Sequence, residues 1–156
     1  MMTKDKAKWA YTAASIDMDG CICLSRTTLQ TSAGNPYFGY DLKVSVANQD
    51  LKVMRWFVRY FGGEFRPKSK NSSKLTDNPG FEWFVSGGYK KIEIFLLGIL
   101  PYLIIKREQA NIALQFIRLN GAVNPVKRAE FHIAMLALNS GKSPTTNTSS
   151  METPVS

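Results

Sequence analysis

The stretch TAASIDMDG, residues 12–20, places two carboxylates on either side of Met18 and stops on Gly20, and a run of β formers, CICLS, begins at once. The residues before it are good helix formers, so the stretch predicts the end of a helix and the start of a strand. Gly20 allows the chain to leave the helix sharply. A carboxylate at a helix C-terminus is electrostatically disfavoured, so Asp19 predicts a cation nearby, and a divalent metal would supply one.

One face of this predicted helix carries almost no large side chains. Small residues at helical spacing let a second backbone approach closely, so we expect this face to be an interface between two chains. The face consists of Ala10, Ala13, Ala14 and Asp17. Asp-Met-Asp-Gly alone also suits a solvated turn, because Asp and Gly are common turn formers.

Composition favours a polyanionic partner. The 156 residues carry a net charge of +8 with a pI near 9.6, which points to nucleic acid ahead of an acidic membrane surface.

Cys21 and Cys23 lie in a strand pattern without a zinc-type spacing, so we expect reduced thiols. His132 is the only histidine, which gives nucleophilic catalysis little support. No signal peptide or membrane span is predicted.

The rest of the chain reads as two hairpins and several helices. Alternation over 21–29 and 37–48 predicts a hairpin with Ile22, Leu24, Leu42, Val44 and Val46 on the core face. Asp50 is the expected N-cap of a helix that Gly62-Gly63 ends. A second hairpin follows over 64–70 and 81–86, and Pro67 predicts that its first strand lies at an edge or bulges. Helical patterns cover 89–103, which Pro101 interrupts, then 106–121 with Gly121 as C-cap, and 124–139.

This order predicts an α+β fold with the layout αββαββα. One antiparallel, saddle-shaped sheet carries its helices on one face, and its other face is left polar and basic. We expect a single domain over residues 1–139 and a disordered Ser/Thr/Pro-rich tail over 140–156.

The string at 12–20 resembles the LAGLIDADG motif of homing endonucleases, with matches at Ala13, Ile16, Asp17, Asp19 and Gly20. Thr12, Ala14, Ser15 and Met18 depart from that motif. NQDLKVMRWFVRYFGG at 48–63 and LPYLIIKREQANIAL at 100–114 are similar to later segments of the same family. The family core has the αββαββα order, so the resemblance covers roughly residues 5–120 and not the motif alone.

The resemblance implies Mg²⁺-dependent hydrolysis of both strands of duplex DNA. A single motif implies a homodimer with a two-fold interface that reads a long pseudo-palindromic site. Asp19 of each subunit would bind the metal, and the Met18 backbone carbonyl is a further candidate ligand. The implied active-site lysine is Lys106. Further candidates are Asn48 or Gln49 as the amide near the metal, and Lys52; Asp17 is expected in helix capping or at the interface.

The free sheet face would read the DNA, because a two-stranded ribbon fits the major groove. By strand parity the candidates are Ser25, Thr27, Asp41, Lys43, Ser45, Gln49, Arg66, Lys68, Glu82 and Phe84. Lys70 and Lys74, in the loop of the second hairpin, are expected to meet phosphates.

Three other interpretations fit parts of the pattern. The first is an RNA maturase that binds intron RNA and assists splicing, and the second is a catalytically inactive DNA-binding regulator. The third, a plain basic α+β protein, leaves the motif matches unexplained. The expected location is the cytoplasm of a bacterial or phage-infected cell, or an organelle, depending on the host.

Overall fold

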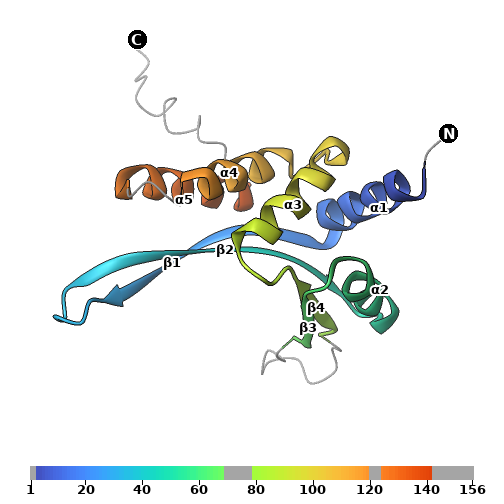
Figure 1. Cartoon of the computed structure of the whole chain (residues 1–156), viewed down its shortest axis with the longest axis horizontal. Coiled ribbons are helices and arrows are strands. Elements are labelled where there is room, and N and C mark those ends of the chain that lie inside the picture. Colours follow the sequence, from blue (N-terminus) through green and yellow to red (C-terminus); the bar gives the residue numbers. More distant parts are fainter. Residues whose placement is uncertain (1–2, 69–78, 120–123, 142–156) are drawn as a thin grey trace, which may run out of the picture.

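The computed structural model describes residues 3–68, 79–119 and 124–141. Helix α1, Lys4–Asp19, begins at Thr3, whose side chain accepts a hydrogen bond from Lys6 N. It ends where Gly20 N donates to Ile16 O. A Cβ atom on Gly20 would lie 2.6 Å from Ile16 Cα, so close approach demands glycine here. The chain then enters strand β1 directly, as the motif predicted (Figure 1).

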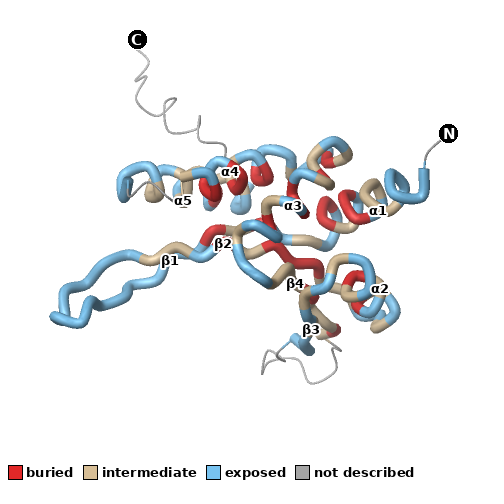
Figure 2. The backbone as a smooth tube through the Cα atoms, viewed as in Figure 1, coloured by how far each residue is buried: buried red, intermediate tan, exposed pale blue. Residues whose placement is uncertain are grey.

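The sheet has four antiparallel strands in the order β1-β2-β4-β3. They are β1 Gly20–Gln30, β2 Pro36–Asn48, β3 Glu64–Pro67 and β4 Phe81–Phe84. β3 is an edge strand, so the edge position predicted from Pro67 is confirmed. The β1–β2 ribbon curves and runs out beyond the helices, and its far end is exposed (Figures 1 and 2).

The helices follow the predicted order. They are α2 Leu51–Phe61, α3 Tyr89–Ile99, the 3₁₀ turn η1 Leu100–Tyr102, α4 Arg107–Arg118 and α5 Pro125–Asn139. Asp50 caps α2 by accepting from Lys52 N at 2.8 Å, and Gly62 ends it, as expected. Pro101 falls in η1, where α3 stops. The C-cap predicted at Gly121, the loop lysines Lys70 and Lys74, and the tail beyond Gly141 lie outside the described residues.

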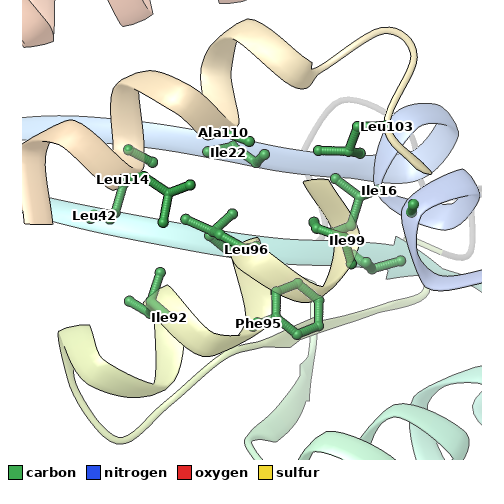
Figure 3. Close-up of a cluster of buried hydrophobic side chains, with 14 of the residues drawn as sticks. Ile16, Ile22, Leu42, Ile92, Phe95, Leu96, Ile99, Leu103, Ala110 and Leu114 are labelled. Carbon is green, nitrogen blue, oxygen red and sulfur yellow. The ribbon is translucent and has the colours of Figure 1, made fainter. Parts of the chain in front are cut away.

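The core lies between one sheet face and the helices. Ile22 and Leu42 from the sheet meet Leu96 of α3 and Ala110 of α4 (Figure 3). These positions confirm the predicted parity, since Ile22, Leu24, Leu42, Val44 and Val46 are all buried.

Trp83 of β4 shows that α2 and α3 cover the same sheet face. Its ring stacks on Phe57 of α2 at 4.7 Å and lies 5.5 Å from Phe95 of α3, while its Nε1 donates to Gly62 O at 2.9 Å. The α+β fold with helices on one face is therefore confirmed, and the opposite sheet face is left for a ligand. In the described part of the chain, no helix is both long and apolar enough to cross a bilayer.

Candidate active site and nucleic-acid interface

The two motif carboxylates have opposite environments. Asp17 is only 6% exposed, and its carboxylate accepts hydrogen bonds from Ile104 N at 2.8 Å, Ile105 N at 3.2 Å and Lys106 N at 2.9 Å. Asp19 is exposed at the end of α1. Asp17 therefore anchors the loop that leads into α4, whereas Asp19 is open to a ligand. Helix capping and an interface contact were the two roles expected for Asp17, and the groups that it holds are backbone N–H groups ahead of the first residue of α4.

Lys106 lies at the C-terminal end of α1. Its Nζ donates to Asp17 O at 2.6 Å, and the residue is half-buried. A cation at a helix C-terminus complements the helix dipole. The sequence argument assigned this compensation to a metal at Asp19, but in the described structure the ammonium of Lys106 already supplies part of it.

Asp19 shares a pocket with the residues that follow β2. Its lining consists of Asp19, Ala47, Asn48, Gln49 and Pro79, and its volume is about 380 Å³. Three predicted site residues, Asp19, Asn48 and Gln49, are thus brought together although about 30 residues of chain separate them. Lys106 and Lys52 do not line this pocket. Lys52 belongs to a separate pocket with Tyr11, Val53 and Trp56 between α1 and α2.

The side chain of Asn48 also stabilises a turn. Its Oδ1 accepts from Asp50 N at 2.8 Å, which forms the turn between β2 and α2. That engagement leaves its amide NH₂ group as the part best able to meet a ligand, and Gln49, exposed on the same pocket, is the other candidate amide.

The donors around Asp19 fit a hard divalent cation in type, because carboxylate and amide oxygens are its preferred ligands. Among the described residues of one chain their number is small. Within residues 3–68, 79–119 and 124–141, no group of three or more His, Cys, Asp and Glu side chains could hold a metal ion. A metal at Asp19 would therefore need oxygens from a second chain, from water or from the substrate.

The outer face of α1 differs from the predicted one. Ala13 is fully buried and Asp17 nearly so, both within their own chain, so the prediction that they form the contact with a second chain is wrong. Ala14 is exposed and Ala10 is half-buried. The residues that project outward with Ala14 are Tyr11 and Met18, the latter 74% exposed.

Ile104 and Ile105 extend this apolar surface beside the end of α1. Ile104 is 86% exposed, and Asp17 holds the backbone of both residues. The sequence contained a signal for the outer face, since residues 11, 14 and 18 share helical spacing. Which of two adjacent helical faces is buried depends on the packing of α1 against β1, β2 and η1.

On the free sheet face most of the predicted DNA-contacting residues are accessible. Ser25, Thr27, Asp41, Gln49, Arg66 and Lys68 are exposed, and Lys43, Glu82 and Phe84 are half-buried. Ser45 is the exception. It is 2% exposed because neighbouring side chains cover it, so the prediction that it touches DNA directly is wrong.

The face was predicted to be polar and basic, and its basic residues are interspersed with the carboxylates of Asp41 and Glu82. Lys43 Nζ pairs with Glu82 Oε1 at 2.8 Å. Burial works to raise the pKa of Glu82, but the hydrogen bonds from Lys43 and Ser45 and the nearby lysine charges outweigh it and lower that pKa. Arg66 lies over the Phe84 ring at 4.5 Å. These contacts fix the positions of charged groups on the face before any ligand arrives.

Cys21 and Cys23 are free thiols at the start of β1, next to Asp19 in the chain. A hydrogen bond from Cys23 holds the pKa of Cys21 down to about 6 against the effect of burial, and the charges of Lys43 and Lys106 act in the same direction. The same bond raises the pKa of Cys23.

Comparison with known proteins gives structural matches only. No protein-family model matches the chain, and no curated sequence matches it. The homing endonuclease I-CvuI, in complex with its target in the presence of 2 mM Ca, matches over 89% of this chain and 86% of its own, with 24% identity and a TM-score of 0.66.

Two further structures extend the match. The archaeal intron-encoded homing endonuclease I-Vdi141I, complexed with DNA, is 15% identical over 90% of this chain and 87% of its own, with a TM-score of 0.65. The I-SmaMI LAGLIDADG homing endonuclease, bound to cleaved DNA, is 17% identical over 86% of this chain, which spans only 43% of it, with a TM-score of 0.57. The chain therefore has the fold of the LAGLIDADG homing endonucleases.

Proposed function

We propose that the chain is a site-specific DNA endonuclease of the homing type, which acts as a homodimer and cuts both strands of duplex DNA with a divalent metal. One observation carries this proposal. The only exposed carboxylate of the motif, Asp19, lies at the junction of α1 with the free sheet face, in a fold shared with DNA-bound homing endonucleases.

Two features of the described residues support a homodimer. The described residues of one chain do not hold enough ligands for a metal, and the outer face of α1 offers Tyr11, Ala14 and Met18 to a partner. A two-fold interface along this face would bring two copies of Asp19 near one axis. Ile104 and Ile105 would widen the contact at the end where the two sites meet.

In the proposed reaction, water adds to a phosphodiester phosphorus and the bond from phosphorus to the 3′ oxygen breaks. Asp19 of each subunit would hold Mg²⁺, with the Met18 carbonyl and Gln49 as further ligands. When bound, the metal supplies a more acidic water and stabilises charge on the leaving oxygen. Lys106 holds a positive charge at the end of α1, close to where phosphate charge would gather. The Asn48 amide group can donate a hydrogen bond in the same pocket.

A catalytically inactive DNA-binding protein is the second candidate. One observation favours it: the ammonium of Lys106 is held by Asp17 O at 2.6 Å and does not line the Asp19 pocket. If Lys106 stays there on DNA, it acts on helix α1 and not on the phosphate.

Selection from a randomised duplex-DNA library tests the proposal. The chain is incubated with the library and Mg²⁺, and both cut and bound molecules are sequenced, while sedimentation reports the mass of the complex. We expect cut molecules to share one long site with two-fold sequence symmetry, bound by two copies of the chain. Binding without cutting at any Mg²⁺ or Mn²⁺ concentration would support the inactive DNA-binding protein, and absence of sequence preference would exclude both.

A further inference from the structure

We propose that Arg66 reads a guanine at one symmetric position in each half-site, and that Glu82 keeps Lys43 from acting as a second, less selective reader. This inference rests on the proposed function, because it assumes that the free sheet face lies against duplex DNA. Beyond that function, Arg66 is the side chain that selects the base, and Glu82 is the side chain that holds Lys43 away from the DNA.

Arg66 is held in place by an aromatic ring and not by a carboxylate. In the sheet register it lies opposite Glu82, yet its guanidinium sits over the ring of Phe84 at 4.5 Å. No ion pair within the described residues involves Arg66. A stacked guanidinium is restrained in orientation, while the N–H donors along its edge remain directed into the surroundings.

Glu82 is engaged elsewhere. It accepts from Lys43 Nζ at 2.8 Å, and Ser45 also hydrogen-bonds to it from beneath. Glu82 lies opposite Ala47 on β2, so the side chain of Lys43 must run along the sheet to reach it. This contact turns the ammonium of Lys43 toward the protein and cancels its charge locally. A lone lysine would otherwise be a flexible point charge, able to bind phosphate or several bases.

The two contacts border one groove. Its volume is about 840 Å³. The residues that line it include Lys43, Arg66, Glu82 and Phe84 from the sheet, and Tyr89 and Ile92 from α3. A groove of this size can take the edge of a base pair. Guanine presents two acceptors, O6 and N7, on its major-groove edge, and an arginine fork meets both at once. The arrangement therefore matches guanine better than any other base.

Competition binding on the selected duplex tests this assignment. We compare the wild-type chain with Arg66→Ala, Arg66→Lys and Glu82→Gln, using the selected duplex and a copy in which a single symmetric G·C pair is replaced in both half-sites. Arg118→Ala, an exposed arginine at the end of α4 in the helix layer, is the charge-matched control.

We expect the wild type to prefer the guanine duplex by about 5- to 140-fold per half-site, and Arg66→Ala to abolish that preference at one position only. Arg66→Lys should lose it too, since lysine keeps the charge but not the fork. Glu82→Gln should bind unselected duplex more tightly, with a salt dependence steeper by about one counterion per subunit, because Lys43 is released.

Failure of the proposed function and failure of this inference would give different results. If the wild type selects no sequence, the proposed function fails. If the wild type selects a site, but Arg66→Ala weakens all duplexes equally and Arg66→Lys restores binding, then Arg66 contacts phosphate and the inference is wrong. Unchanged binding of unselected duplex by Glu82→Gln would remove the restraining role of Glu82.

Discussion

Replacing Asp17 by asparagine should destabilise the protein far more than the same change at Asp19. Asp17 is almost fully buried and accepts three backbone N–H groups. Asparagine keeps the shape and one acceptor oxygen, but its NH₂ group would oppose a backbone donor. The loss of a charge-assisted hydrogen bond and an unsatisfied N–H together cost about 2–5 kcal/mol. Asp19 is exposed, so Asp19→Asn should change the free energy of unfolding by no more than about 0.5 kcal/mol.

Equilibrium urea unfolding, followed by tryptophan fluorescence, measures both variants against the wild type. Hydrogen exchange at the amides of Ile104, Ile105 and Lys106 gives a local readout, because Asp17→Asn should accelerate exchange there in the native state. A free energy of unfolding for Asp17→Asn within about 0.5 kcal/mol of the wild-type value would show that the carboxylate of Asp17 does not hold this loop. Equal destabilisation by the two variants would also contradict the prediction, since it would mean that Asp19 is held as firmly as Asp17.

Three more predictions concern the fold and the sheet face. Gly20→Ala should lower stability by about 1–3 kcal/mol in the same urea experiment, since the new methyl group would press on the backbone of Ile16; a neutral result would mean that α1 can shift. Trp83→Phe removes the hydrogen bond to the carbonyl that ends α2 and leaves space in the aromatic cluster, and should cost about 2–4 kcal/mol by thermal or urea unfolding. The Lys43–Glu82 pair should stabilise the fold in full above the ordinary glutamate pKa of about 4.3 and progressively less below it, because the folded-state pKa of Glu82 is lowered. The stability difference between wild type and Glu82→Gln should accordingly shrink as the pH falls through that lowered pKa, and a difference that persists at the lowest pH where the protein folds would contradict the assignment.

Much of the fold was readable from local patterns. Alternation assigned the buried face of β1 and β2, because each strand has one apolar and one polar side, and Asp50 and Gly62 marked the ends of α2 by their capping chemistry. The motif itself located the junction of α1 with β1. These features depend on neighbours in sequence, which is why they could be predicted.

The parts that could not be predicted depend on contacts between distant segments. The carboxylate of Asp17 reaches backbone groups 87 to 89 residues away, and Lys106 returns its ammonium to α1 across the same gap. Ala13 and Ala14 are equally small, yet one is buried and the other exposed, because tertiary packing decides the rotation of α1. Ser45 obeys the predicted parity but is covered by neighbouring side chains, which parity cannot foresee.

We propose that Asp19 takes part in cutting and not in folding or in recognition. The measurement that tests it most directly uses the selected duplex, Mg²⁺, and wild-type and Asp19→Asn proteins at equal occupancy of the DNA. We expect both proteins to bind with similar affinity and only the wild type to make a double-strand break. Cutting by Asp19→Asn at the wild-type rate would contradict it, as would loss of binding together with loss of cutting.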